Sequence, residues 1–372
     1  MNNSFEPLKS VLMIFSGSYN GHYARDLAHG FQDLKIKIGF ISLLGASKPS
    51  WLTGAYAQDF SSNFNPDLSI LGKVFKAISV VRKFRPDIIQ THLFYGGIVG
   101  LIVGRILRIP VIHTRHHIDE HYQSGSIFHR FLDRMMARHA NHVVVCSEAA
   151  KQWLINIEGQ KESHITVINQ GFDFKFLSPS LEDIKKAESE LGFSDDSLDI
   201  ICVARYSRTK GQAYLLLALS ELVKTIPNIS LTFMGPGDKQ WLVKLVTELG
   251  LEHYVTIRPP RDDVPACIAA ADMVIHPSLA DSFSQLVIEA QAVGGLLVAS
   301  DIAAAREQII DGVTGIIVSP REPKEIVEAV HFLISNPELA KSLRQKGARH
   351  VREKFPWQRM VSEEIECLSK FV

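Results

Sequence analysis

Short apolar runs alternate along the whole chain with longer segments in which apolar residues recur every three or four positions. Continuous Val/Ile-rich runs are typical of parallel strands covered on both faces, and the longer segments are typical of the covering helices. In the first half the runs predict strands at residues 10–15, 37–43, 87–91, 111–114, 142–146 and 165–168. The segments between them predict helices that include residues 21–34, 72–84, 96–107 and 147–157. We therefore expect a doubly wound α/β domain.

This alternation is interrupted between residues 172 and 197, where FDFKFLSPS, a charged stretch and GFSDDS predict a linker. It then resumes, with strands predicted at residues 198–204, 230–234, 254–257, 273–275, 296–299 and 315–318. The second half is thus a second doubly wound domain. Ligands of such sheets bind beyond the carboxyl ends of the strands, so we expect two such domains to enclose a cleft.

The composition is that of a globular protein long enough for two domains. Four cysteines without paired spacing and no signal-peptide pattern predict a reducing, cytoplasmic setting without a disulfide framework. The apolar window IVGLIVGRILRIPVI is interrupted by Arg105 and Arg108 before the roughly 18 residues that a membrane span needs. We interpret it as buried helix and strand.

Charge is divided unevenly along the chain, although the net charge is zero. Residues 1–178 hold 19 Lys and Arg against 13 Asp and Glu, a net +6, and the rest of the chain carries −6. The segment GKVFKAISVVRKFR predicts Lys73, Lys76 and Lys83 near one helix face, and HRFLDRMMARH spaces its arginines by one helical turn. These features favour contact with an anionic partner such as a lipid surface. Ordinary basic outer faces of packed helices remain the alternative.

Two polar loops follow predicted strands of the second half. RYSRTKG supplies Arg205 and Lys210 and ends at Gly211, which opens a helix. Cations beside a helix N-terminus suit a diphosphate, and a polar loop with an ion-paired Arg is the alternative. FMGPGDKQ places Gly235 and Gly237 where missing side chains let the backbone approach a ligand. Neither GxGxxG nor GxxxxGK[ST] occurs, which argues against dinucleotide and P-loop sites.

The stretch DSFSQLVIEAQAVG carries two acids eight positions apart. Apolar spacing from Leu286 onward predicts a buried helix, so Asp281 lies in the loop before it and Glu289 lies two turns into it. A helix-capping Asp281 and a surface Glu289 are the structural alternative.

The chain resembles the retaining family 4 glycosyltransferases of the GT-B fold. The order of segments seen in that family is the order here of RYSRTKG, FMGPGDKQ, DSFSQLVIEAQAVG and IIDGVTGIIVSP. RPDIIQTHLFYGGIVGLIVGRILRIPVIHTRHH, ANHVVVCSEAAKQWLI and ITVINQGFDFKFLSP resemble the N-terminal domain of that family. The resemblance implies an acceptor-side domain at residues 1–175 and a donor-binding domain at 176–355. It also implies a last helix, at 356–372, that crosses back to the first domain.

In that family a Glu-x7-Glu motif stands where this chain has Asp281 and Glu289. The resemblance implies that Asp281 faces the transferred sugar, that Glu289 holds the ribose, and that the backbone N–H groups of residues 284–286 are free for the diphosphate. The chain departs from the family by its shorter first acid and by Ser-Phe-Ser-Gln in place of Gly-Phe-Gly-Leu. Donor-binding residues implied in this way are Gly21, Arg205, Lys210, Gly235, Asp281, Phe283, Ser284, Gln285, Leu286 and Glu289.

The implied reaction moves a hexose-type sugar from a UDP- or GDP-linked donor to a hydroxyl of a glycan or lipid-linked acceptor, with retention. Catalytic roles fall on His116, Asp281, Arg205 and Lys210, where His116 supports the sugar and the two cations stabilise the leaving diphosphate. No cofactor and no metal are expected, because fixed cations can replace a divalent ion. Nucleic acid is not an expected partner. Peripheral contact between the N-terminal domain and the inner face of the cell membrane is expected.

The sequence leaves two other functions open. HIDEH, residues 117–121, satisfies the H-x-x-E-H pattern of zinc proteases, but it directly follows a strand and lacks an evident third ligand. A nucleotide-sugar epimerase or a non-catalytic sugar-nucleotide binder would use the same scaffold, because a fold alone does not fix an activity.

Overall fold

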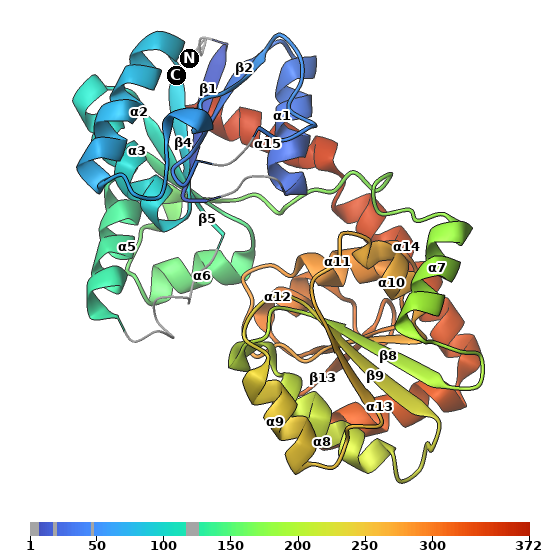
Figure 1. Cartoon of the computed structure of the whole chain (residues 1–372). Coiled ribbons are helices and arrows are strands. Elements are labelled where there is room, and N and C mark those ends of the chain that lie inside the picture. Colours follow the sequence, from blue (N-terminus) through green and yellow to red (C-terminus); the bar gives the residue numbers. More distant parts are fainter. Residues whose placement is uncertain (1–6, 18–20, 46–47, 117–125) are drawn as a thin grey trace. The chain divides into compact units, whose positions relative to one another are not determined.

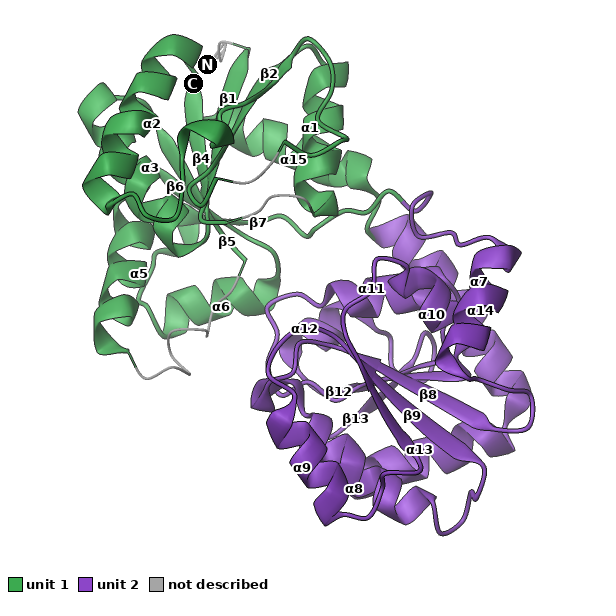
Figure 2. Cartoon of the chain, viewed as in Figure 1, with its two compact units in different colours: residues 1–173, 355–372 green, residues 174–354 purple. Residues whose placement is uncertain are grey.

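The computed structural model describes residues 7–17, 21–45, 48–116 and 126–372. The chain divides into two compact units (Figure 2). Unit 1 comprises Met1–Asp173 and Phe355–Val372, and unit 2 comprises Phe174–Lys354. Each is a parallel sheet with helices on both faces, in agreement with the expected fold (Figure 1).

Unit 1 is built on a seven-stranded sheet of order β3-β2-β1-β4-β5-β6-β7, and all of its pairings are parallel. Its strands are β1 (Ser10–Phe15), β2 (Lys37–Ser42), β3 (Ala57–Asp59), β4 (Ile88–His92), β5 (Val111–Arg115), β6 (His142–Val145) and β7 (Ile165–Val167). Every residue of β1, β4, β5 and β6 is buried, because helices cover both faces of the sheet.

The helices of unit 1 are α1 (His22–Asp33), α2 (Ile70–Phe84), α3 (Leu93–Leu107), α5 (Ile127–His139), α6 (Glu148–Asn156) and α15 (Trp357–Ser369), with short η1 (Ser61–Asn63) and η2 (Glu162–His164). Apolar residues of α1 and α15 pack on one face of the sheet with Val11 and Met13. Those of α2 and α3 pack on the other face with Leu12 and Ile14. The alternation of side chains along β1 thus feeds two separate cores.

Helix α15 carries the end of the chain back onto α1 of unit 1 (Figure 1). The two helices lie close together at Gly30, where a Cβ atom would lie 2.5 Å from Cγ1 of Val361. Buried Glu364 of α15 accepts hydrogen bonds from Tyr23 (2.7 Å) and Gln90 (3.0 Å). The C-terminal helix is therefore part of the core of unit 1.

Unit 2 is built on a six-stranded parallel sheet of order β10-β9-β8-β11-β12-β13. Its strands are β8 (Leu198–Val203), β9 (Ile229–Met234), β10 (Val255–Arg258), β11 (Met273–His276), β12 (Leu297–Ser300) and β13 (Ile316–Val318). Its helices are α7 (Leu181–Leu191), η3 (Arg208–Lys210), α8 (Gln212–Leu222), α9 (Gln240–Glu248), α10 (Val264–Ala270), α11 (Gln285–Ala292), α12 (Ala303–Gln308), α13 (Pro323–Ser335) and α14 (Pro337–Lys354). Residues of α8, α9 and α13 form one core and those of α7, α10 and α11 form another.

Each predicted strand is confirmed to within one residue at either end. The apolar window around Arg105 is α3 followed by β5, as interpreted. In the described part of the chain, no helix is both long and apolar enough to cross a bilayer.

Three expectations need correction. The expected linker at 172–197 contains α7, which begins with a capping box between Ser180 and Asp183 and buries Ala187 and Leu191. Strand β3 was missed because it spans only three residues. Lys73 does not lie on an outward basic face, because its side chain is buried and directs Nζ to the carbonyl of Pro66 (3.4 Å).

Candidate active site

Two loops at the carboxyl ends of neighbouring strands meet in unit 2. Strands β8 and β11 are paired, so the loops that follow them lie side by side. The backbone N–H of Leu279 donates to the carbonyl of Thr209 (2.8 Å), which joins the two loops. Gly211 has φ of 68°, and a Cβ atom there would lie 1.8 Å from the carbonyl oxygen of Pro277. A glycine is therefore required at this crossing.

Lys210 and Asp281, one from each of these loops, form a two-point ion pair. The Lys210 Nζ atom lies 2.7 Å from Oδ1 and 2.8 Å from Oδ2 of Asp281. Both side chains are only 16% exposed. The structure thus brings together two residues that the sequence assigned to different parts of a donor, the diphosphate and the sugar.

His276 completes this group and was missed in the sequence. It is the last residue of β11, is buried, and places Nε2 3.1 Å from Oδ2 of Asp281 and 3.1 Å from Oγ of Ser284. Its Nδ1 atom is buried without a hydrogen-bond partner in the described part of the chain. The one sign of His276 in the sequence was a polar residue at the end of an otherwise apolar strand. Such a residue does not by itself identify a functional site.

The carboxylate of Asp281 is held in its charged form. Burial alone raises the pKa of this carboxyl, but the hydrogen bond from His276 and the charge of Lys210 outweigh burial and hold the pKa well below its usual range. The group therefore presents a fixed negative charge beside a fixed positive charge.

Glu289 has the opposite environment. It lies in α11, is half-buried, and has neither an ion pair nor a hydrogen-bond partner among the described residues. Burial raises its pKa to about 7. A half-buried carboxylate without a partner is costly in the free protein, so this one is ready to accept hydroxyl donors from a ligand.

The backbone of Ser284, at the start of α11, is already hydrogen-bonded within the protein. Gln308 accepts a hydrogen bond from the backbone N–H of Ser284 (3.3 Å) and donates one to its carbonyl (3.1 Å). The expectation that the Ser284 N–H is free for a diphosphate is therefore wrong in this structure. Gln308 was not predicted, because it lies in α12 and is joined to the loop only by the fold.

The other predicted donor residues of unit 2 differ in their exposure. Phe283 and Leu286 are buried, and Gln285 is exposed. Arg205 is exposed, and its guanidinium makes no ion pair within the described ranges. A Cβ atom at Gly235 would lie 2.1 Å from the carbonyl oxygen of Ala204, so the neighbouring strand end itself accounts for this glycine.

In unit 1, His116 lies immediately after β5 and is half-buried. Its Nε2 atom lies 3.0 Å from Nδ1 of His92, the last residue of β4, and its Nδ1 atom lies 3.4 Å from Nε2 of Gln170. Tyr23 packs edge-on against His116, with ring centroids 5.1 Å apart. Burial, followed by the charges of His116 and His113, lowers the pKa of His92 well below its usual value. His92 is therefore neutral.

Gly21 caps the start of α1, where an added Cβ atom would meet no atom of the described residues within 4 Å. The space expected there is thus present. The next residue, His22, packs its ring on Phe172 with centroids 4.5 Å apart.

The residues of HIDEH fall within 117–125, outside the described residues. Among the residues that the structure describes, no group of three or more His, Cys, Asp or Glu side chains is arranged to hold a metal ion.

Two family models match the chain and together cover most of it. The model described as Glycosyltransferase Family 4 matches residues 21–176, and the model described as Glycosyl transferases group 1 matches residues 183–350. A D-inositol 3-phosphate glycosyltransferase of Paenarthrobacter aurescens is 29% identical over 303 residues, which are 77% of this chain and 74% of that protein. One from Arthrobacter sp. is 24% identical over 80% of this chain and 74% of its own length.

Solved structures of the same fold superimpose along almost the whole chain. Anabaena Alr3699/HepE in complex with UDP and glucose has a TM-score of 0.82 at 24% identity, covering 97% of this chain and 100% of that one. A glycosyltransferase from Rickettsia africae ESF-5 has a TM-score of 0.77 at 18% identity, covering 98% of each chain. WaaG, a glycosyltransferase involved in lipopolysaccharide biosynthesis, has a TM-score of 0.73 at 13% identity, covering 96% of this chain and 99% of its own.

Proposed function

Because the chain belongs to the family 4, group 1 glycosyltransferases of the GT-B fold, we propose that it transfers a hexose-type sugar, with retention, from a UDP- or GDP-linked donor to a hydroxyl of a glycan or lipid-linked acceptor. UDP is favoured of the two nucleotides, because HepE was solved with UDP-glucose as well as with UDP. Surface polysaccharide or glycoconjugate synthesis is the setting that this chemistry fits.

The observation that carries the proposal is the pairing of Asp281 with Lys210 two turns before an unpartnered Glu289. A ribose offers two adjacent hydroxyl donors, and a carboxylate accepts both, each charge-assisted bond contributing roughly 1.5 to 3 kcal/mol. The Glu289 carboxylate is available to accept these hydroxyls, because no described residue donates a hydrogen bond to it. Asp281, whose carboxyl has its pKa held well below the usual range by His276 and Lys210, then faces the hydroxyls of the sugar.

The reaction breaks the bond between the anomeric carbon and a phosphate oxygen and forms a bond from that carbon to the acceptor oxygen. Lys210 and exposed Arg205 stabilise the negative charge that develops on the leaving diphosphate. The acceptor attacks from the face that the diphosphate leaves, and its proton passes to a departing phosphate oxygen. His116, hydrogen-bonded to His92, contacts the sugar as positive charge develops on the sugar ring. These residues take the place of a divalent metal.

For a lipid-linked acceptor we propose peripheral contact with the inner face of the cell membrane through α5. Its first turns expose Ile127, Phe128 and Phe131, at 79%, 67% and 57% of their surfaces. Arg134 and Arg138 are exposed farther along the same helix. Apolar side chains followed by cations suit an anionic bilayer surface. A cytoplasmic location agrees with the four cysteines, which are all free.

The donor is tested by thermal unfolding with a panel of nucleoside diphosphates and their sugars. A ligand at 100 times its dissociation constant adds about 2.7 kcal/mol to the free energy of unfolding. We expect UDP to stabilise the wild type, and Glu289→Ala to lose most of that gain while remaining folded. Proton NMR of the product then reports whether the anomeric configuration is retained. Donor hydrolysis or epimerisation that does not depend on an acceptor would favour an epimerase and refute transfer.

The membrane contact is tested separately by sedimentation with vesicles that contain phosphatidylglycerol. Phe128→Ser together with Phe131→Ser should reduce binding, whereas Phe332→Ser, an exposed phenylalanine of unit 2, should not. Equal binding by the wild type and the double variant would exclude α5 as the contact.

A further inference from the structure

The amino ends of β1, β2 and β4 in unit 1 border an open depression of about 730 Å³, which we term the basic depression. Six cationic residues line it, namely Lys9, Lys35, Lys37, Arg82, Lys83 and Arg85. Asp87 is the one acid among the described residues of its lining. Oδ2 of Asp87 already accepts from the backbone N–H groups of Lys9 and Ser10, both at 2.8 Å, and from the Ser10 hydroxyl at 3.1 Å. Positive charge therefore dominates this surface.

Five of these cations lack an acidic partner among the residues that the structure describes. Lys35, Lys37, Arg82, Lys83 and Arg85 are exposed, and none forms an ion pair in the part of the chain that the structure describes. Like charges gathered around one depression repel one another, so they raise the free energy of the empty site and lower that of a site occupied by an anion.

Two of the cations occupy costly backbone positions. Lys35 has φ of 60° and Arg85 has φ of 54°, the left-handed region that glycine adopts most easily. Both stand at the ends of helices, α1 and α2, where glycine is the common choice. The negative end of a helix dipole attracts cations to such positions. That effect does not account for Lys37, which begins β2.

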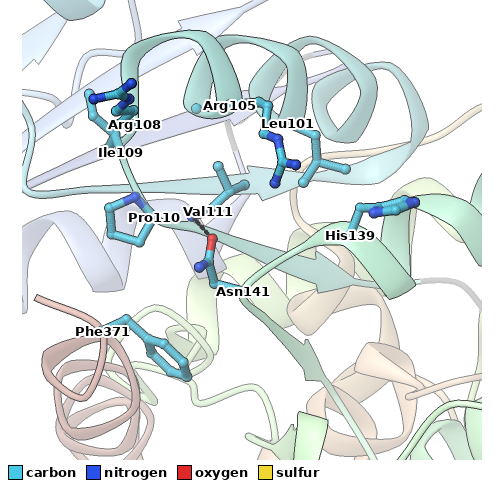
Figure 3. A pocket seen from close by; sticks show the side chains of 10 residues that line it. Leu101, Arg105, Arg108, Ile109, Pro110, Val111, His139, Asn141 and Phe371 are labelled. Carbon is cyan, nitrogen blue, oxygen red and sulfur yellow. Dashed lines mark hydrogen bonds between the residues drawn. The ribbon is translucent and has the colours of Figure 1, made fainter.

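The next depression along the same end of the sheet provides a comparison (Figure 3). Arg105, Arg108 and His139 line it, but Leu101, Pro110 and Val111 form much of its wall. Arg108, with φ of 57°, ends α3 in the same conformation in which Arg85 ends α2. Helix-end geometry is thus shared by both depressions, whereas the density of cations is higher in the basic depression.

We propose that the basic depression binds an anion that carries two or more phosphate groups. Its volume is that of a small-ligand site, and its guanidinium and ammonium groups match phosphate oxygens. It lies at the opposite end of the strands from His116, so its occupant is distinct from the sugar donor. The proposal does not depend on sugar transfer, and phosphate chemistry can be supplied by a soluble compound or by lipid headgroups.

The test uses the full chain with saturating UDP present, which occupies the proposed donor site. Isothermal titration with inorganic tripolyphosphate probes the soluble source. Sedimentation with phosphatidylglycerol vesicles against phosphatidylcholine vesicles probes headgroups, and every protein in that assay also carries Phe128→Ser and Phe131→Ser, which remove the proposed α5 contact. The variant Lys35→Gly with Arg85→Gly removes two cations and retains the left-handed backbone, so it should unfold at the wild-type temperature or above. Arg108→Gly is the matched control.

We expect the double variant to bind tripolyphosphate or the anionic vesicles about 100-fold more weakly, roughly tenfold for each cation removed. The control should bind within about twofold of the wild type. Saturable binding to tripolyphosphate assigns a soluble ligand, and binding to anionic vesicles alone assigns headgroups. The proposal is overturned if neither probe binds, or if Arg108→Gly weakens binding as much as the double variant does. UDP affinity, measured separately without tripolyphosphate, tests the donor site, so a failure of one assignment is distinguishable from a failure of the other.

Discussion

At the scale of single residues, the ion pair between Lys210 and Asp281 predicts a separation of two kinds of binding. Asp281→Asn removes the charge that holds Lys210, so the ammonium becomes free for a diphosphate. We expect the variant to bind UDP at least as tightly as the wild type and to lose about 100-fold or more in sugar transfer, because the proposed function assigns this acid to the sugar. Calorimetry with UDP and a product assay measure the two effects.

Asp301→Asn supplies the control, because Asp301 pairs with Arg306 in an exposed ion pair of the same unit. That change should leave both UDP affinity and transfer within about twofold of the wild type. Loss of UDP binding in Asp281→Asn would contradict the assignment of this acid to the sugar.

The raised pKa of Glu289 predicts a pH-dependent stability. Its folded pKa is about 7, above the ordinary value of 4.5, so the unfolded chain releases this proton first as pH rises. At acidic pH the protonated Glu289 carboxyl therefore does not lower the free energy of unfolding. As pH rises from about 4.5, the group lowers that free energy increasingly, up to about 3 kcal/mol above pH 7. Glu289→Gln should gain stability over the wild type across that window in urea unfolding. A difference that stays constant with pH would contradict the raised pKa.

Sequence spacing found the acids of the candidate site but not the side chains that set their chemistry. Asp281 and Glu289 were predictable because both fall in one short stretch whose helical period is clear. His276 and Gln308 act through contacts made by the fold, across 5 and 24 positions of the chain. The hydrogen bond from the Ser284 N–H to Gln308 could not be predicted either, because only the fold brings these residues together.

At the scale of elements, the contact between α1 and α15 predicts a rescue experiment. Gly30→Ala places a methyl group 2.5 Å from Val361, and overpacking of this kind costs about 1 to 3 kcal/mol. Val361→Ala leaves space at the same point, so the double variant should recover part of the loss. Urea unfolding of the four proteins gives the coupling energy. Purely additive effects would show that the helices are not packed at Gly30.

Helices and strands were predictable where the apolar pattern was long. The prediction failed where the segment was short or highly charged. Strands buried on both faces are nearly continuous apolar runs, so their ends were placed to within one residue. Helix α7 was taken for part of a linker because only one face of a charged segment is apolar. Its capping box was a usable signal. Strand β3 pairs only with β2 at the sheet edge and offers three residues.

At the scale of the whole molecule, two parallel sheets with covered faces were predictable because one rhythm runs through both halves. The boundaries of the units depend on long-range packing, which a local pattern does not report. The chain leaves unit 1 after Asp173 and returns at Phe355, and the returning helix buries Glu364 against Tyr23. A buried acid within an otherwise amphipathic helix gives no sign in the sequence of what it meets.

The roles proposed for one residue of each unit predict two distinct defects. Glu289→Ala, in unit 2, should weaken UDP binding at least tenfold, because the ribose loses its acceptor. His116→Ala, in unit 1, should leave UDP affinity unchanged and lower transfer about 100-fold, because this side chain acts only on the sugar. Calorimetry with UDP and initial rates at saturating donor separate the two. If His116→Ala weakened UDP binding as much as Glu289→Ala, the nucleotide would be held by unit 1 and the assignment of donor binding to unit 2 would be wrong.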